Sequence, residues 1–313
     1  MSGFNLNNLN SLDNLERDKD LSGLTSLGVG GKAEYYVEPE SIDDFKAAFK
    51  LGLENKLKIY ILGGGSNVIF PDDDIKALVI STKNKKFNKI LFNDNNVRVQ
   101  AGCSLARLAA EAAKNNLSGL EFAVGIPGTV GGAIFGNAGA GGHGIAELVS
   151  ELIIIDDKCE LKKLSAEDFS YGYRNFEINN IDKNKILILE CVLKLHEAER
   201  ELIDAEIKRY LSKRVNQPLG RSAGCTFKNP EIKNKNINNN NENNLSAGKL
   251  LDDCGCKGLE CGDAIVSENH ANFILNRGRA RSEDIINLIK ICQERVFNRT
   301  GVMLEPEIKF MAL

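Results

Sequence analysis

Three features that mark particular classes of protein are missing from the sequence. No apolar run is long enough to cross a membrane. The formal net charge of -3 at pH 7 shows no excess of the basic residues that nucleic-acid-binding proteins use. The N-terminal residues lack the basic and apolar regions of a secretory signal peptide. We therefore expect a cytoplasmic protein with neither a membrane nor a nucleic acid as its partner.

Patterns for a disulfide frame, a zinc site and a Rossmann domain are also missing. The eight cysteines are scattered, which is typical of reduced thiols. Cys254, Cys256 and Cys261 lie close together, but their spacing is not that of a paired Cys-x-x-Cys site. Because no fourth ligand is evident, we expect no metal. No Gly-x-Gly-x-x-Gly motif joins a strand to a helix, so a Rossmann domain is not supported.

Glycine, by contrast, is concentrated in two segments. Residues 119–142 contain nine glycines among 24 residues, too many for the interior of a helix or strand. Residues 63–67, Gly-Gly-Gly-Ser-Asn, directly follow the apolar run 59–62. Such segments expose main-chain N–H groups that bind anions, and they let a flat ligand approach the backbone. Together they indicate a large phosphate-bearing cofactor.

Hydrophobic periodicity predicts an α+β chain. Helices are expected at 42–55 (capped by Ser41), 105–115, 197–213, 246–253 and 282–299. Strands are expected at 33–37, 57–62, 77–81, 89–92, 97–101, 151–156, 186–195, 264–266, 273–275 and 303–310. Residues 1–20 read as a poorly packed lead-in. The Asn-rich run 231–245 cannot bury enough apolar surface to fold and is predicted to be a disordered insertion.

Six short motifs then occur in a specific order. They are Gly63–Asn67, Gly125–Gly132, Tyr173-Arg174, Ala223–Pro230, His270–Phe273 and Leu304–Glu307. Across about residues 20 to 310 this ordered set resembles the UDP-N-acetylenolpyruvoylglucosamine reductase family, which makes UDP-N-acetylmuramate for peptidoglycan and the cell wall. The short spacing between Arg174 and Cys225 is similar to the branch that lacks an extra tyrosine loop.

The resemblance implies an FAD-binding domain of vanillyl-alcohol-oxidase type in two α/β subdomains, 20–75 and 76–197. A C-terminal α+β substrate domain, 198–302, would follow, and the strand 303–310 is a candidate to return to the first subdomain. The resemblance also implies non-covalent FAD, NADPH as hydride donor, a UDP-sugar substrate and a monomer. Its FAD-binding positions are Gly63, Gly64, Gly65, Ser66, Asn67, Gly125, Ile126, Pro127, Gly128, Thr129, Gly131, Gly132, Asn137 and Ala138. His143 is expected near FAD without a covalent link.

The implied chemistry makes demands on three residues. Hydride addition to an enol ether conjugated to a carboxylate creates enolate-like charge, which needs a cation and a proton donor. Arg174 matches a carboxylate with its planar fork, and Glu307 can hydrogen-bond the same group when protonated. The family position of the proton donor, usually serine, is Cys225 here. A thiol, with a reference pKa of about 8.5, is the stronger acid but is oxidisable. We predict these three residues to be catalytic.

The resemblance assigns substrate contacts to Tyr173, Lys228, Asn229 and His270. Three of these assignments have a structural alternative. Lys228 and Asn229 fit a solvated turn, and His270 fits a satisfied structural histidine.

The catalytic candidates have alternatives as well. Cys225 could be a core residue, and Arg174 a surface ion-pair partner. Glu307 alternates with Glu305 on the predicted final strand, so both could be solvated. Asn216 stands where relatives commonly carry a lysine, and Lys213 or Arg214 could replace that charge.

Two other function classes remain open at this point. The first is another FAD-dependent oxidase or dehydrogenase of the same superfamily, which oxygen turnover or a covalent flavin would reveal. The second is a non-catalytic nucleotide-binding module, which would bind FAD or a UDP-sugar without turnover.

Overall fold

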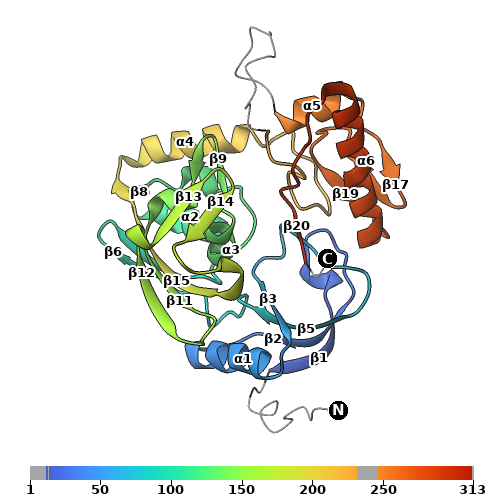
Figure 1. The fold of residues 1–313 in the computed structure, drawn as a ribbon. Helices are drawn as coiled ribbons and strands as arrows, with labels where there is room; N and C mark the ends of the chain where they lie inside the picture. The colour runs from blue at the N-terminus through green and yellow to red at the C-terminus, as the bar shows by residue number, and fades with distance from the viewer. Residues whose placement is uncertain (1–11, 13, 231–245, 312–313) are drawn as a thin grey trace. The chain divides into compact units, whose positions relative to one another are not determined.

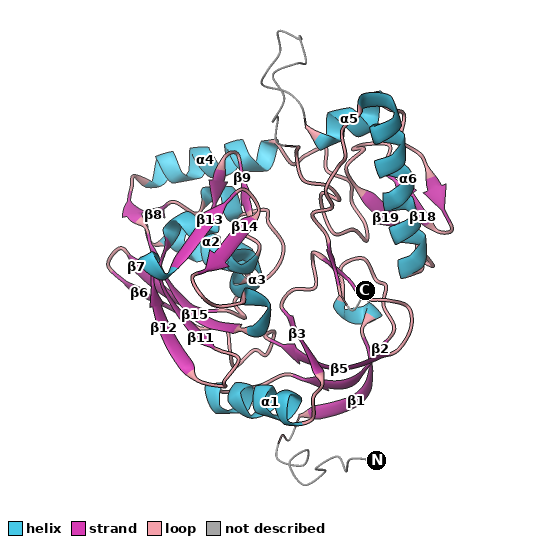
Figure 2. Ribbon diagram, in the orientation of Figure 1, coloured by secondary structure: helices cyan, strands magenta, loops and turns pink. Residues whose placement is uncertain are grey.

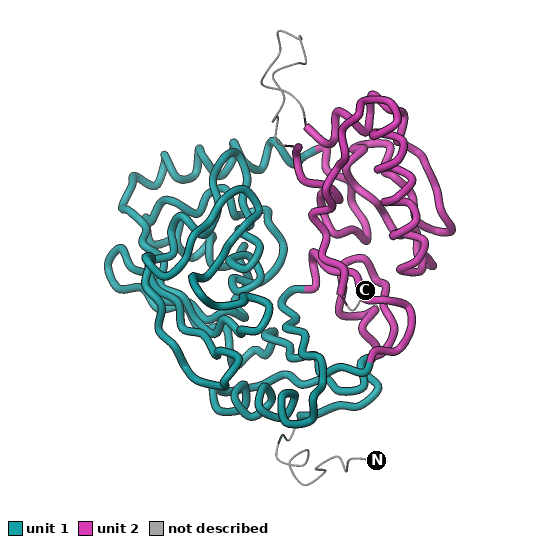
Figure 3. The backbone as a smooth tube through the Cα atoms, in the orientation of Figure 1, with its two compact units in different colours: residues 1–19, 33–64, 76–215 teal, residues 20–32, 65–75, 216–313 magenta. Residues whose placement is uncertain are grey.

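The computed structural model describes residues 12, 14–230 and 246–311, which form two structural units (Figure 3). Unit 1 comprises residues 1–19, 33–64 and 76–215, and unit 2 comprises residues 20–32, 65–75 and 216–313. The chain therefore passes between the units several times. The insertion predicted at 231–245 lies outside the described residues.

Unit 1 contains a four-stranded sheet with one helix packed on it (Figure 1). Its elements are β1 (Leu15–Asp20), β2 (Lys32–Val37), α1 (Ile42–Glu54), β3 (Lys58–Leu62) and β5 (Ile75–Ser81), and the strand order is β1-β2-β5-β3. α1 forms because Ser41 caps its first turn, while Phe45 and Phe49 fall on its buried face. Both rings pack in one cluster with Leu78 and Ile80 of β5. The predicted strand–helix–strand order is confirmed.

β1 corrects the expectation that residues 1–20 are a poorly packed lead-in. Residues 15–20, Leu-Glu-Arg-Asp-Lys-Asp, form the edge strand of this sheet although most of their side chains are exposed or half-buried. An edge strand is held by main-chain hydrogen bonds on one side and needs little apolar pattern. The sequence pattern therefore gave no sign of it.

A second sheet in unit 1 has five antiparallel strands in the order β12-β11-β15-β7-β6. The elements of this region are β6 (Ile90–Asn93), β7 (Asn96–Gln100), α2 (Leu105–Lys114), β8 (Leu117–Ser118), α3 (Val130–Phe135), β9 (Gly139–Ala140), β10 (His143–Gly144), β11 (Val149–Ile155), β12 (Leu161–Ser165), β13 (Phe169–Gly172), β14 (Asn175–Ile178), β15 (Leu187–Lys194), β16 (His196–Glu197) and α4 (Arg200–Ser212). One sheet face shares a core with α2 and α3, including Val97, Leu108 and Ile134. β12, β13 and β14 were missed because each is only four or five residues long, too short for a clear pattern.

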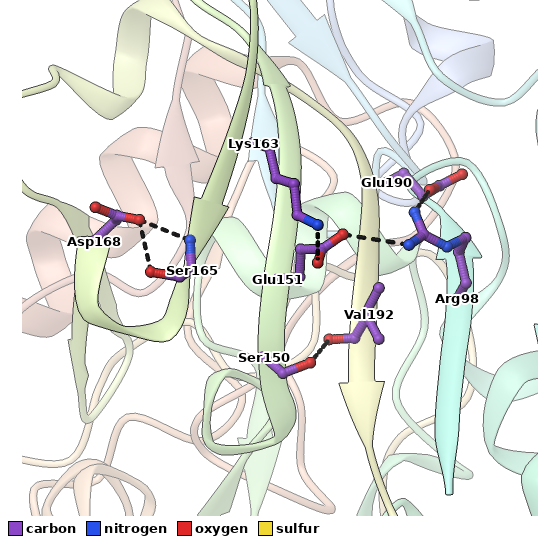
Figure 4. A network of polar contacts seen from close by, with 8 residues as sticks. All are labelled: Arg98, Ser150, Glu151, Lys163, Ser165, Asp168, Glu190 and Val192. Carbon is purple, nitrogen blue, oxygen red and sulfur yellow. Dashed lines mark hydrogen bonds and ion pairs between the residues drawn. The ribbon is translucent and has the colours of Figure 1, made fainter. Parts of the chain in front are cut away.

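Charged side chains cross this sheet from strand to strand (Figure 4). Arg98 of β7 pairs with Glu190 of β15 at 2.5 Å and with Glu151 of β11 at 3.3 Å. Lys163 of β12 reaches Glu151 at 2.6 Å. The hydrogen bond from Lys163, more than the guanidinium of Arg98, holds the pKa of Glu151 below its usual value. The ladder links four neighbouring strands through their side chains.

Unit 2 is built around one long helix and a small sheet (Figure 2). Its elements are β4 (Val68–Ile69), α5 (Ala247–Asp253), β17 (Glu260–Cys261), β18 (Ala264–Val266), β19 (Ile274–Asn276), α6 (Ser282–Thr300) and β20 (Lys309–Phe310). Ile285, Leu288 and Val296 bury one face of α6 in the core. The helix ends at Gly301, whose φ of +73° is the left-handed conformation of a helix C-cap.

The predicted final strand, 303–310, is mostly wrong. Only residues 309–310 form a strand, which pairs in parallel with β4. Residues 303–308 instead run as an irregular segment, and Leu304 and Ile308 are buried in the core of unit 2. The burial of these residues therefore reflects packing of an irregular segment against the core, and not strand pairing in a sheet.

No cysteine among the described residues is in a disulfide. Cys254, Cys256 and Cys292 belong to the apolar core of unit 2, as small hydrophobes do. No group of histidine, cysteine or acidic side chains among the described residues is arranged to hold a metal ion. Within the same residues, no helix has both the length and the apolar character to span a bilayer.

Candidate active site

Two glycine loops of unit 1 pack directly against each other. A Cβ at Gly64 would lie 2.6 Å from Cα of Gly128, and a Cβ at Gly63 would lie 2.4 Å from Oγ1 of Thr129. Real Cβ contacts are not this short, so both positions require glycine. The structure thus brings together two segments that the sequence analysis had linked only by composition.

The longer glycine stretch contains a helix, which corrects the expectation that glycine excludes one there. Thr129 caps α3 by accepting a hydrogen bond from the main chain of Gly132 at 3.4 Å. Gly131 allows α3 to approach β7 closely, because its N–H bonds to Ala101 O at 2.9 Å. A Cβ there would lie only 2.8 Å from the Ala101 side chain. The Thr cap before an apolar turn was the available sign of this helix.

Gly132 and Gly136 leave one strip of α3 without side chains. A Cβ at Gly132 would meet only Thr129 Oγ1, at 3.5 Å, and one at Gly136 only Gly132 O, at 3.7 Å. Positions four residues apart share a helix face. This strip of bare backbone, next to the packed glycine loops, fits the close approach of the flat, phosphate-bearing cofactor expected from the sequence.

The hairpin β13–β14 carries Tyr173 and Arg174 at its turn and is tied to the glycine stretch. Asn137 is buried, donates from Nδ2 to Gly172 O at 2.8 Å, and accepts from Ala146 N–H at 3.0 Å. Both ends of its amide are thus held by the protein, which fixes the side chain between the hairpin and the glycine stretch. Ala138 follows it and is half-buried.

Arg174 lies at the turn of the hairpin in a left-handed conformation. Its φ is +53°, a value that turns often require and that other described non-glycine residues share, among them Asp18 and Lys56. Its Nη1 donates to Gly139 O at 2.9 Å, and the guanidinium lies 5.4 Å from the centre of the Tyr173 ring. The turn therefore holds a cation and an exposed aromatic ring beside the glycine stretch.

Arg214 is one of the two candidates to replace the lysine that relatives commonly carry at the position of Asn216. Its Nη1 donates to the carbonyl of Gly125, and a Cβ at Gly125 would lie 2.7 Å from Arg214 Cδ. The charge of Arg214 is therefore placed against the glycine stretch of unit 1. The ammonium of Lys213 instead lies 5.9 Å from the ring centre of Tyr210.

Unit 2 contains a pocket of about 420 Å³ that gathers three predicted residues. Cys225, Asn229 and His270 line it, together with Lys249, Lys257 and Asn272, which the sequence analysis did not single out. Cys225 is partly exposed, unlike the buried Cys254. The alternative that Cys225 is a core residue is therefore wrong.

A main-chain ladder joins the Cys225 segment to the Glu307 segment. Glu307 N–H donates to Thr226 O at 2.8 Å, and Lys228 N–H donates to Glu305 O at 2.9 Å. Asn67, from the first glycine loop, donates from Nδ2 to Glu307 O at 3.1 Å. Two predicted catalytic residues, Cys225 and Glu307, thus lie on adjacent, hydrogen-bonded segments of unit 2.

Glu305, Lys228 and Asn229 have structural partners that the sequence did not reveal. The side chain of Glu305 is 70% exposed and pairs with Lys228 Nζ at 2.5 Å. Asn229 accepts a hydrogen bond from Ala247 N–H at 3.0 Å, which helps to begin α5. Glu307 is only half-buried, so the two glutamates do not share one solvated environment.

His270 lines the pocket as a neutral imidazole. Its Nδ1 accepts the Asn272 N–H at 3.2 Å, so the proton resides on Nε2. Burial lowers the pKa of His270 below its ordinary value. The ring lies edge-on to Phe273, with 4.9 Å between their centres. A neutral Nε2–H donor beside a thiol suits the binding of polar or anionic groups.

Comparison with known proteins covers almost the whole chain. Residues 215–311 match the family model described as UDP-N-acetylenolpyruvoylglucosamine reductase, C-terminal domain, and residues 33–165 match the FAD binding domain model. A UDP-N-acetylenolpyruvoylglucosamine reductase of Clostridium tetani is 37% identical, over 97% of this chain and 94% of the relative. That of Clostridioides difficile is 35% identical, over 98% and 97% respectively. The crystal structure of the reductase from Thermus caldophilus superimposes with a TM-score of 0.78 at 33% identity, covering 95% of this chain and 98% of that one.

Proposed function

Because the chain belongs to the UDP-N-acetylenolpyruvoylglucosamine reductase family, we propose that it reduces UDP-N-acetylglucosamine enolpyruvate to UDP-N-acetylmuramate. The enzyme uses FAD and NADPH and serves peptidoglycan synthesis. Its chain has the α+β architecture of an FAD-binding domain followed by a reductase C-terminal domain.

The glycine loops of unit 1 would hold the cofactor. When bound, FAD supplies the hydride carrier between NADPH and the substrate. Gly63, Gly64 and Gly128 keep the loop backbones free of side chains, and the bare strip at Gly132 and Gly136 leaves room for a flat ring system. The main chain of residues 125–132, with Asn137 and Ala138, completes the proposed binding segment.

The residues that the family resemblance assigns to the reaction would bind and protonate the substrate. Arg174 binds the substrate carboxylate through its planar guanidinium. Glu307, in its protonated form, hydrogen-bonds the developing enolate, and Cys225 delivers the proton to carbon. Tyr173, Asn229 and His270 orient the substrate, and Lys228 acts through its ion pair with Glu305.

One observation carries the assignment of the acid. The hydrogen bond from Glu307 N–H to Thr226 O sets the main chain of Cys225 beside that of Glu307, and Cys225 faces a pocket together with His270. A cysteine that only filled space in the core would need neither the neighbouring Glu307 main chain nor access to a pocket. This arrangement supports a proton donor and a carboxyl group serving the same reaction.

The flavin spectrum tests the proposal directly. Purified protein should be yellow, and NADPH should bleach it under anaerobic conditions. Addition of UDP-N-acetylglucosamine enolpyruvate should then restore the oxidised spectrum, with UDP-N-acetylmuramate as product. A bleached protein that this substrate fails to reoxidise, or one that oxygen reoxidises rapidly, would contradict the proposal and favour a flavin oxidase.

We also propose that the protein works in the cytoplasm. In the part of the chain that the structure describes, no cysteine is in a disulfide, which suits a reducing compartment.

A further inference from the structure

One buried asparagine contacts the Cys225 segment at three points. The side chain of Asn272 is 3% exposed. Its Oδ1 accepts from Phe227 N–H at 2.9 Å, and its Nδ2 donates to Phe227 O at 2.9 Å. Its main-chain carbonyl also accepts from Thr226 N–H at 2.8 Å. A single residue therefore fixes the backbone of the two residues that follow Cys225.

The same residue also fixes the imidazole. The main-chain N–H of Asn272 donates to His270 Nδ1, as described above, and this bond selects the Nε2–H tautomer. Cys225, His270 and Asn272 all line the same pocket. Thr226 contributes no side-chain fixation of its own, because its buried hydroxyl finds no hydrogen-bond partner among the described residues.

We propose that Asn272 is a positioning residue for the proton donor: its amide holds the Cys225 turn in register with the imidazole of His270. The proposal rests on the proposed function, in which Cys225 supplies the proton. It adds a residue that touches neither the transferred proton nor the hydride. A side-chain amide can both accept from Phe227 N–H and donate to Phe227 O at any pH at which the protein is folded, because it does not ionise.

The physical consequence is a fixed thiol position. Proton transfer to carbon depends on the placement of the donor, and a misplacement of about 1 Å can cost on the order of 10²-fold in rate. Loss of the amide would leave a buried N–H and a buried carbonyl of Phe227 without partners, so the turn would shift to find new ones.

Asn272→Ala provides the first test, in the FAD-loaded full chain. We expect flavin reduction by NADPH to be unchanged and substrate-dependent reoxidation to slow on the order of 10²-fold. The pH profile for alkylation of Cys225 by iodoacetamide, followed by mass spectrometry, should also shift, and this readout needs no turnover. The Nε2–H signature of His270 in ¹H–¹⁵N spectra should persist, which verifies that the turn 270–273 is intact.

Asn272→Asp provides a conservative rescue. A protonated carboxyl can again donate to Phe227 O while accepting from Phe227 N–H, whereas the carboxylate cannot. Burial beside a carbonyl raises the pKa of such a group. Relative to Asn272→Ala, reoxidation by Asn272→Asp should therefore recover as the pH falls.

Asn276→Ala is the matched control. Asn276 is also buried, donates to Leu27 O at 2.8 Å, and accepts from Gly278 N–H at 2.7 Å, but it makes no side-chain bond to the Cys225 segment. The variant Asn276→Ala should lower the melting temperature without shifting the pH profile for alkylation of Cys225. Equal slowing of reoxidation in both alanine variants, or an unshifted profile in Asn272→Ala, would overturn the proposal. If Cys225 proves not to be the acid, the alkylation profile still decides whether Asn272 fixes its thiol.

Discussion

Among single residues, Cys225 carries the sharpest prediction. Cys225→Ala should still allow NADPH to reduce the flavin, but product formation should fall by about 10²–10⁴-fold, the usual contribution of a positioned acid. Cys225→Ser should keep substantial activity because a hydroxyl can also donate a proton. Stopped-flow spectroscopy separates the two half-reactions.

Cys261→Ala serves as the control for this experiment. Cys261 is another partly exposed cysteine of unit 2, on β17, and its loss should leave both half-reactions intact. Full turnover by Cys225→Ala would exclude the thiol as the acid.

His270 predicts how stability depends on pH. Burial lowers its pKa in the folded protein, whereas the unfolded chain keeps a value of about 6.5. Below about pH 6.5 the unfolded state therefore binds more protons, and the free energy of unfolding falls as the pH is lowered. Above that pH the contribution of the neutral imidazole is fully present.

Urea unfolding at a series of pH values between about 5 and 8, which spans the reference value of histidine, measures this dependence. His270→Gln should flatten the slope, because it removes the titrating group. His196→Gln, at an exposed position on β16, is the control. An unchanged slope in His270→Gln would mean that other groups dominate the titration.

The sequence identified residue types better than it identified their partners. It singled out Cys225, Asn229 and His270, which the structure places around one pocket. It could not show that Lys228 pairs with Glu305 or that Asn272 clamps Phe227. Those partners lie 77 and 45 residues apart in the chain, and no local pattern encodes a contact of that range.

At the level of elements, the close packing of the two glycine loops predicts that adding one methyl group at Gly64 destabilises the protein. In Gly64→Ala the new Cβ would lie 2.6 Å from Gly128 Cα, and overpacking of this kind costs about 1–3 kcal/mol. We expect a lower melting temperature and a lower content of bound FAD in the purified protein. Gly23→Ala, whose Cβ would meet nothing within 4 Å, should behave like the wild type.

The charge ladder on the five-stranded sheet predicts a second effect at this level. Glu151→Gln removes the negative charge shared by Arg98 and Lys163 and should lower the free energy of unfolding by about 0.5–1 kcal/mol. The pKa of Glu151 is lowered in the fold, so its contribution is present above the unfolded value of about 4.3 and is lost as the pH falls through the folded value.

Denaturant unfolding at neutral pH and at pH values below about 4, where glutamate protonates, measures this contribution. The difference between Glu151→Gln and the wild type should shrink at low pH and in high salt. Glu54→Gln removes a more exposed partner, 3.6 Å from Lys50, and should have a smaller effect. Equal losses in the two variants would argue against a special role of the ladder.

Elements with caps and apolar periodicity were predicted well, and polar ones were not. α1 has the expected Ser41 cap, and both α1 and α6 have a buried apolar face. β1 and the hairpin β13–β14 are held by main-chain pairing and expose most of their side chains, so composition pointed to loops. α3 was missed because its glycines serve close packing against Ala101.

For the whole molecule, the order of the sequence motifs identified the family, whereas hydrophobic periodicity identified only single elements. Six short motifs in one order pointed to the flavoenzyme family to which the chain belongs. Periodicity could not show that residues 20–32 and 65–75 belong to the same unit as the C-terminal third. Such an assembly depends on contacts between distant segments, including the β4–β20 pair and the bond from Ser282 Oγ to Phe70 O at 2.6 Å.

The discontinuous unit 2 has a consequence for biosynthesis. Val68 and Ile69 pair with Lys309 and Phe310, which are synthesised much later than they are. Until those residues emerge from the ribosome, the early strand has no partner for its hydrogen-bonding edge, and non-local pairing of this kind is slow and prone to aggregation. A nascent chain that stalls before Lys309 would be unable to form this pair, so loss of the segment that contains Lys309 and Phe310 should act as a folding lesion.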